Sequence, residues 1–142
     1  MNIKDTKDRI IEYFSTRPEI KVGYIFGSRA KGEGGKLSDI DIGILIDEDK
    51  VPKDVPYGYK AKVIAELMNI LKTEKVDLVI LNESPLFLCF RIIHDGVILY
   101  SKDEKKRVDF EVKIISRYLD RKFYYDRHIN LSLATIAKEG IL

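Results

Sequence analysis

The spacing of apolar residues along the chain predicts four helices. Over about residues 5–16, Ile10, Ile11 and Phe14 recur at helical spacing, and Asp5 or Thr6 is available as a cap. A third helix is expected between Ser84 as N-cap, with Pro85 at its first position, and Gly96. From about 103 to 138 the period is helical throughout. A second helix is predicted over about 57–72, with an apolar stripe of Ala61, Ile64, Ala65, Met68 and Leu71.

Short runs rich in β-branched residues lie between these helices and predict four strands. They cover about 21–26, 39–46, 75–81 and 97–100, and residues 27–38 read as a glycine-rich loop. Strands that alternate with helices are typical of a layered α/β or α+β fold. We therefore expect one domain over residues 1–142, with a small mixed sheet flanked by helices and a long C-terminal helix.

Charge and cysteine content narrow the functional classes. The chain has 25 Lys and Arg against 23 Asp and Glu, a net charge of +2, which is too balanced to indicate nucleic-acid or membrane binding. The sequence shows no secretory leader and no apolar run of membrane-spanning length, so we expect a cytoplasmic protein. The single cysteine, Cys89, lies in an apolar run and is expected to be a buried core residue.

Two aspartates interrupt the second predicted strand. Side chains alternate in a strand, so Asp39 and Asp41 point to one face, with Cα atoms about 6.5–7 Å apart. Carboxylates this close repel by about 2–3 kcal/mol at an effective dielectric near 20. A divalent cation such as Mg²⁺ removes that repulsion because it prefers oxygen ligands. The alternative is that both acids cap the strand end in solvent, and the pair alone leaves the two readings open.

A third aspartate favours the metal interpretation. Asp77 occupies the third predicted strand on the face opposite Val76, Leu78 and Ile80. If this strand lies beside the second, three carboxylates converge and leave coordination positions for phosphate oxygens.

The loop before the acids offers an anion site. Gly27 and Ser28 follow the first strand, where backbone N–H groups can face a phosphate, and Arg29 and Lys31 come next. A Gly-Ser pair is a weak signal alone, since most glycine-rich loops are turns. Its spacing to Asp39 and Asp41 makes it specific.

Gly-Ser, a spacer and Asp-x-Asp resemble the signature of the nucleotidyltransferase superfamily, here written GSRAKGEGGKLSDID. The order of elements and the tail resemble its minimal branch, the MntA-type adenylyltransferase antitoxins of HEPN/MNT systems. The resemblance implies that Asp39, Asp41 and Asp77 bind Mg²⁺, two ions in all, and act in catalysis. Gly27 and Ser28, with Arg29 and Lys31 as weaker candidates, would then bind the triphosphate of ATP.

The same resemblance implies AMP transfer to a tyrosine of a HEPN-type (HepT-like) ribonuclease toxin. An antitoxin that only occludes its toxin, or a nucleotidyltransferase acting on a small molecule, are the alternatives. The helix from about 103 is expected to cover the sheet with Phe110, Ile114, Tyr118 and Leu119 and to expose Tyr124, Tyr125 and Ile129 to a partner. A homodimer of this chain is the competing use of that surface.

Overall fold

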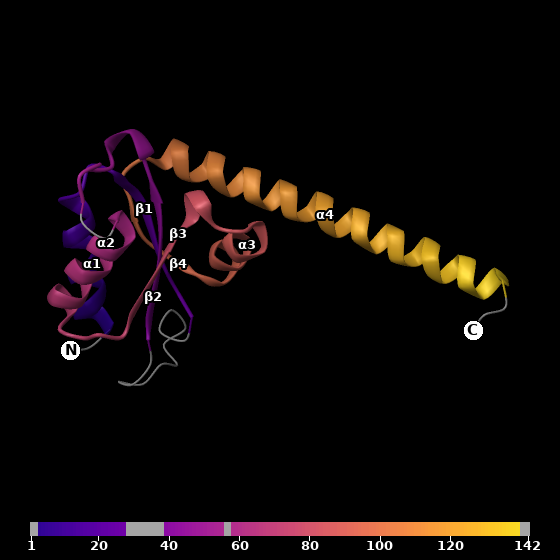
Figure 1. The fold of residues 1–142 in the computed structure, drawn as a ribbon, viewed down its shortest axis with the longest axis horizontal. Coiled ribbons are helices and arrows are strands. Elements are labelled where there is room, and N and C mark those ends of the chain that lie inside the picture. Colours follow the sequence, from indigo (N-terminus) through magenta and orange to yellow (C-terminus); the bar gives the residue numbers. More distant parts are fainter. Residues whose placement is uncertain (1–2, 28–38, 56–57, 140–142) are drawn as a thin grey trace.

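A four-stranded sheet with helices on both faces forms the body of the protein (Figure 1). The computed structural model describes residues 3–27, 39–55 and 58–139. The strands lie in the order β3-β2-β1-β4. In chain order the helices and strands are α1 (Ile3–Ser15), β1 (Ile20–Phe26), β2 (Ile40–Ile46), α2 (Tyr59–Leu71), β3 (Val76–Ile80), α3 (Leu86–Asp95), β4 (Val97–Ser101) and α4 (Glu104–Glu139). The predicted mixed α/β fold is confirmed.

Two apolar clusters occupy the two faces of the sheet. Helices α1 and α2 pack on one face, where Ile10, Phe14, Leu67 and the isoleucines of β2 are buried. Helices α3 and α4 cover the other face through Cys89, Ile92 and Ile114, against Val22, Tyr24 and Leu45. Each strand alternates its side chains between the faces, so both layers receive apolar residues from the same short sequence.

Strand directions place three strand ends together. β1 runs antiparallel to β2, so the end of β1 meets the start of β2. β3 runs parallel to β2 after the crossover through α2, so the starts of these two strands also meet. Gly27, Asp39, Asp41 and Asp77 lie at this end of the sheet.

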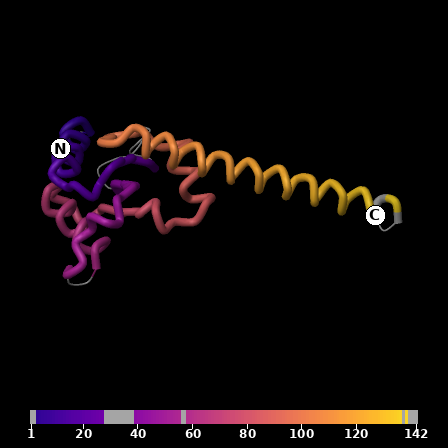
Figure 2. Tube along the Cα trace, turned by 90° about the horizontal axis from the view of Figure 1, so that it is seen from above, coloured from indigo at the N-terminus to yellow at the C-terminus, as the bar shows by residue number. Residues whose placement is uncertain are grey.

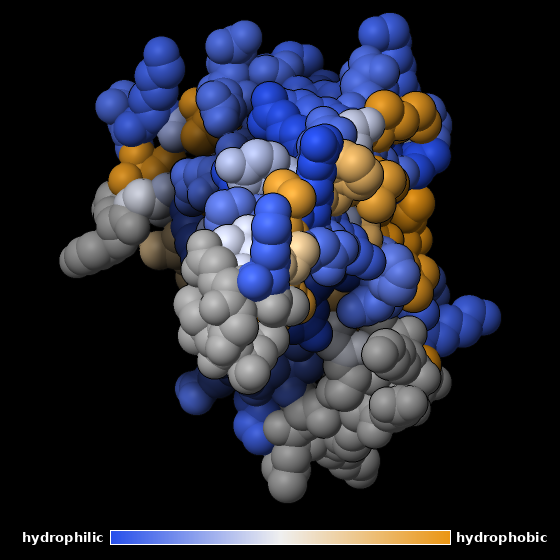
Figure 3. All heavy atoms as spheres, turned by 90° about the vertical axis from the view of Figure 1, so that its right-hand side faces the viewer, coloured by the Kyte–Doolittle hydropathy of each residue, from blue (hydrophilic) through white to orange (hydrophobic). Residues whose placement is uncertain are grey.

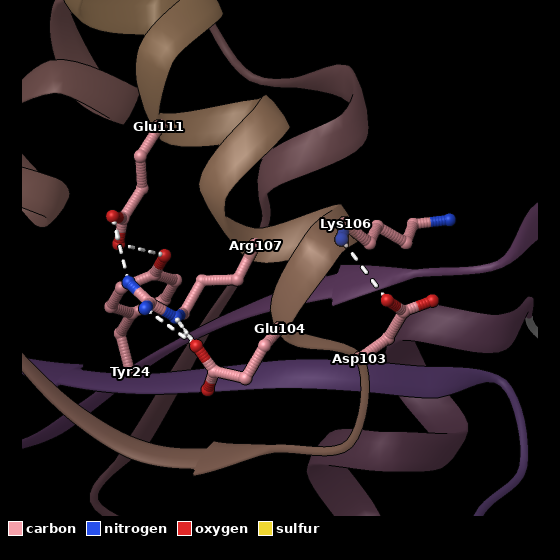
Figure 4. A network of polar contacts seen from close by, with 6 residues as sticks. All are labelled: Tyr24, Asp103, Glu104, Lys106, Arg107 and Glu111. Atoms are coloured by element: carbon pink, nitrogen blue, oxygen red, sulfur yellow. Dashed lines mark hydrogen bonds and ion pairs between the residues drawn. The ribbon is translucent and has the colours of Figure 1, made fainter.

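Helix α4 starts at the opposite end of the sheet, and a polar network fixes it there (Figure 4). The Tyr24 hydroxyl of β1 donates to Glu111 Oε1 over 2.8 Å, and Arg107 Nη1 donates to Glu111 Oε2 over 2.9 Å. Asp103 caps the helix by accepting from the Lys106 backbone N–H over 3.0 Å. Burial and the neighbouring Glu111 raise the pKa of Tyr24, so its hydroxyl stays protonated as a donor.

Most of α4 extends beyond the body of the protein (Figures 1 and 2). Its 36 residues span about 54 Å at the rise of an α-helix. Tyr118 of α4 packs on two aromatic side chains of α3. Its ring stacks on that of Phe90 with the centroids 3.7 Å apart and lies edge-on to that of Phe87 at 5.8 Å. Tyr124, Tyr125 and Ile129 are exposed, as predicted.

Four sequence predictions of detail were wrong. Asp5 and Thr6 lie inside α1, which already includes Ile3. Ala61 and Ala65 are exposed, because α2 turns the larger Val63, Leu67 and Leu71 to the core. The other two errors concern the N-cap of α3 and the covered part of α4. Ser84 does not cap α3, since its hydroxyl donates to the Ile80 carbonyl, and Pro85 takes the cap position. Leu119 is 54% exposed, because it follows Tyr118 by one residue and so points about 100° away from the side of α4 that packs on α3.

Cys89 is buried, as predicted, and burial raises the pKa of its thiol. None of the helices in the described part of the chain combines the length and the apolar character needed to cross a membrane.

Candidate active site

The three predicted aspartates lie at the end of the sheet where β1 finishes and β2 and β3 begin. Asp41 is the register partner of Asp77 across the parallel β2–β3 pair. Asp39 comes directly before β2 and is exposed. Directly opposed residues in a sheet point to the same face, so the Asp41 and Asp77 side chains are neighbours. The condition on which the sequence argument depended, that the strand of Asp77 lies beside the strand of Asp41, is met.

The opposite face of these strands is apolar, which holds the acids in place. Ile40, Ile42 and Ile44 of β2 are buried against α1 and α2, together with alternate residues of β3. A shift of β2 by one residue would turn these isoleucines away from α1 and α2 and would place Asp41 in the core between them. Core packing therefore fixes which way Asp41 and Asp77 point.

Gly27 lies against the Asp41 carboxylate. It follows Phe26, the register partner of Asp41, and adopts a positive φ of 76°. A Cβ at this position would overlap Asp41 Oδ2 and would lie 3.3 Å from its Cγ. Glycine is needed here both for the left-handed backbone and for the close approach. The sequence argument assigned Gly27 only to a phosphate and missed this contact, which the antiparallel β1–β2 register reveals.

The local electrostatics are those of crowded carboxylates. Burial raises the pKa of Asp41, and the charges of Asp77 and Asp39 raise it further. Asp41 is half-buried while Asp39 and Asp77 are exposed, so the repulsion is concentrated on the residue with least access to water. A cation at this end of the sheet would relieve that repulsion.

The residues present fit a divalent cation that shares its ligands with a substrate. Within the described ranges, no group of three or more His, Cys, Asp or Glu side chains is arranged to hold a metal ion by itself. Asp41 and Asp77 are adjacent oxygen donors, however, and Mg²⁺ commonly binds through one or two carboxylates plus substrate phosphates and water. The donor set therefore suits Mg²⁺ in the presence of a phosphate ligand.

Part of the predicted site falls on residues that the structure does not describe. Ser28, Arg29 and Lys31 lie between the described ranges 3–27 and 39–55. Of the predicted site residues, the structure brings together Gly27, Asp41 and Asp77. Asp39 lies two residues before Asp41 in the chain, and its charge acts on the Asp41 carboxylate.

Comparisons with known proteins give a family match, a curated relative and similar solved structures. Residues 8–105 match the family described as "Polymerase beta, Nucleotidyltransferase". The chain is 25% identical over 118 residues to the protein adenylyltransferase MntA of Aphanizomenon flos-aquae (strain 2012/KM1/D3). This alignment covers 80% of this chain and 78% of that protein.

Two solved structures are similar over nearly the whole chain. One is a toxin-antitoxin with AMP-PNP, at 25% identity and a TM-score of 0.68, covering 89% of this chain and 98% of the other. The second is a tri-AMPylated Shewanella oneidensis HEPN toxin in complex with MNT antitoxin, where the matched chain has 22% identity and a TM-score of 0.65, covering 93% and 99%. The second likeness supports the fold alone.

Proposed function

The chain belongs to the polymerase beta nucleotidyltransferase family, and from this premise we propose that it is a protein adenylyltransferase antitoxin. In this proposal it transfers AMP from ATP to a tyrosine hydroxyl of a HEPN-type ribonuclease toxin and so neutralises it. The observation that carries the proposal is the cross-strand pair Asp41–Asp77, with Gly27 packed on the Asp41 carboxylate. The similarity to MntA and to the toxin-antitoxin with AMP-PNP supports the choice of reaction and partner.

In the proposed reaction, the tyrosine oxygen forms a bond to the α-phosphorus of ATP while the bond to the β-phosphate oxygen breaks, and pyrophosphate leaves. Asp39 and Asp41 would hold Mg²⁺, and Asp77 would complete a second metal position. Bound Mg²⁺ supplies positive charge that neutralises the phosphate oxygens during transfer. Asp77, exposed at the start of β3, is the residue we assign to accept the proton of the attacking hydroxyl.

The phosphate end of ATP would bind at the turn after β1. Gly27 has no side chain to exclude a phosphate, and the positive φ of this residue turns the backbone at the strand end. The proposed triphosphate ligands remain Ser28, Arg29 and Lys31, because of their position in the family motif. The core beneath β1 and β2 keeps this end rigid, so the chain's main contribution is to position the phosphates.

We also propose that the toxin docks along α4. A cavity of about 690 Å³ lies between α3 and α4, lined by the aromatic residues Phe87, Tyr118, Tyr124 and Tyr125. Exposed aromatic residues beside a cavity are typical of protein interfaces. Truncation after Lys122 should therefore weaken toxin binding in a domain that still folds, because the packed part of α4 ends at Tyr118.

The test is AMP transfer from ATP to a purified HEPN-type toxin, followed by intact-mass analysis of the toxin. The double variant Asp39→Asn/Asp41→Asn should remain folded, bind the toxin and transfer no AMP, and transfer by the wild type should require Mg²⁺. The matched control is Glu48→Gln/Asp49→Asn, which removes the same two charges from exposed positions beyond the far end of β2. Wild-type transfer by the double variant would refute the site.

The same variants separate catalysis from occlusion. If the double variant binds the toxin without AMP transfer and the toxin remains an active ribonuclease, neutralisation depends on modification. If the toxin is silenced equally well by the double variant, occlusion is the mechanism and the proposed chemistry is not needed. Asp77→Asn should lower the transfer rate by orders of magnitude with a smaller change in ATP affinity, since we place Asp77 near the acceptor.

A further inference from the structure

The exposed flank of α4 carries an apolar repeat that packing within one chain leaves uncovered. Val112, Leu119 and Leu133 are 57%, 54% and 51% exposed, and Ile115 and Ile129 are also exposed. Figure 3, viewed from the side to which α4 projects, shows hydrophobic spheres at several places on the surface, among hydrophilic ones. These residues belong to one series, the α4 seam, in which the spacing alternates between three and four residues: Val112, Ile115, Leu119, Lys122, Asp126, Ile129, Leu133 and Ile136.

This spacing is the heptad repeat of helices that pair along their length. The spacing continues over more than three heptads, about 36 Å of helix, with apolar residues at six of its eight positions and Lys122 and Asp126 at its centre. The seam runs beside the side of α4 that packs on the domain, which consists of Phe110, Ile114 and Tyr118, and the two sides meet at Lys122. The exposed apolar residues of the seam are left uncovered by the described part of the domain and are open to a second helix.

We propose that the seam pairs α4 with α4 of a second copy of this chain, in antiparallel orientation. The argument comes from the two charged positions in the middle of the seam, Lys122 and Asp126. In a parallel pair each would face its own kind, and buried like charges destabilise an interface. In an antiparallel pair centred between them, Lys122 of each copy faces Asp126 of the other.

The same register pairs the remaining positions correctly. When Lys122 faces Asp126 of the second copy, Leu119 faces Ile129 and Ile115 faces Leu133. Val112 then faces Ile136, so each remaining layer is apolar on both sides. A shift by one heptad would bury Lys122 against Leu119 and lose the charge pairs. The seam is thus self-complementary in one register, as the two-fold symmetry of a homodimer requires.

Two exposed aromatic residues fit the same arrangement. Phe123 and Tyr125 are 69% and 64% exposed and flank the seam on either side of its centre. In the antiparallel pair each lies beside its own symmetry mate, next to the Lys122–Asp126 contacts. Aromatic side chains at this place would exclude water from the charge pairs and strengthen them.

The first experiment measures the mass of the isolated full chain by sedimentation equilibrium, without nucleotide or partner. We expect a mass twice the 16.4 kDa of one chain. Leu119→Glu should give monomers, while the matched control Leu131→Glu should remain dimeric, because Leu131 is similarly exposed on the same helix but lies off the seam. A monomeric wild type, or equal dissociation by both variants, would overturn the proposal.

The second experiment tests the orientation by disulfide cross-linking. Ile115→Cys and Leu133→Cys should cross-link when mixed and should not cross-link alone, and the native Cys89 is buried and does not compete. Cross-links within either single variant would indicate parallel pairing and refute the register. Lys122→Asp and Asp126→Lys should each weaken the dimer by about tenfold or more, and the double swap should restore it.

These tests are independent of the proposed AMP transfer, because mass and cross-linking require neither ATP nor a toxin. A wild type that is monomeric alone but loses toxin binding on Leu119→Glu would show that a partner helix covers the seam, and this would overturn the second-copy proposal. A dimer that transfers no AMP would leave the seam intact and refute the proposed function instead.

Discussion

Gly27→Ala tests whether the backbone turn after β1 positions the Asp41 carboxylate. Two separate effects are expected. The positive φ of 76° costs an alanine about 1–2 kcal/mol of folding free energy. The added Cβ would also overlap Asp41 Oδ2, because the two atoms would lie less than 3.0 Å apart, a separation that Cβ atoms in proteins essentially never show. The carboxylate must therefore move, by on the order of 1 Å, and a displacement of this size can lower a rate by about 10²-fold.

Gly58→Ala is the matched control for this variant. Gly58 also has a positive φ, of 89°, but a Cβ there would meet nothing within 4 Å. Gly27→Ala should lose about 3–8 °C in melting temperature for 1–2 kcal/mol in a domain of this size, and Gly58→Ala should lose at least as much, because the φ of 89° and ψ of 163° at Gly58 are essentially confined to glycine. Only Gly27→Ala should lose AMP transfer, and the assay is the toxin mass shift at saturating ATP and Mg²⁺. Full activity in Gly27→Ala, or equal losses in both variants, would refute the positioning argument.

Two further predictions concern stability. Burial and the charges of Asp77 and Asp39 raise the pKa of Asp41 in the folded state, so the metal-free protein loses stability as the pH rises through the carboxyl range. Asp41→Asn should therefore raise the urea midpoint at neutral pH. This gain in stability should vanish once the pH falls below the ordinary aspartate pKa. A lower midpoint for the variant at neutral pH would contradict the sign. Tyr24→Phe should cost about 1–2 kcal/mol in urea unfolding because it removes the hydrogen bond to Glu111, and this cost should fall markedly in a Glu111→Gln background; additive effects would mean that the contact contributes little.

The arrangement of the candidate site was predictable in part because it depends on local periodicity. Alternation along one strand put Asp41 on the face opposite Ile40 and Ile42, and this holds in the structure. The pairing of Asp41 with Asp77 required one more assumption, that the two strands are neighbours, which the helix between them makes reasonable for parallel strands. The contact of Gly27 with Asp41 could not be derived, since it depends on the register of an antiparallel pair joined by a long loop.

The errors in the helices have a common cause. Periodicity shows that a stripe exists, but tertiary packing decides which of two adjacent stripes faces the core. In α2 the core receives Val63 and Leu67 in place of the predicted alanines, because these larger side chains bury more apolar area. In α4 the exposure of Leu119 could not be judged from its apolarity, because it depends on which side of α4 packs on α3. Ser84 had a competing acceptor in the Ile80 carbonyl, which only the three-dimensional turn reveals.

The position of α4 has a consequence for how dimer and active site coexist. β4 ends at Ser101, the register partner of Val22 near the start of β1, so α4 begins at the end of the sheet opposite to Gly27 and Asp41. The seam and the carboxylates thus lie at different ends of the molecule, and antiparallel pairing of α4 covers neither Asp41 nor Asp77. The aromatic cavity beside α3 meets the seam at its centre, since Lys122 lines it together with Phe87 and Tyr118. A dimer joined through the seam would therefore leave the carboxylates of both copies accessible, while a second copy and a toxin would compete for Lys122 and Tyr125.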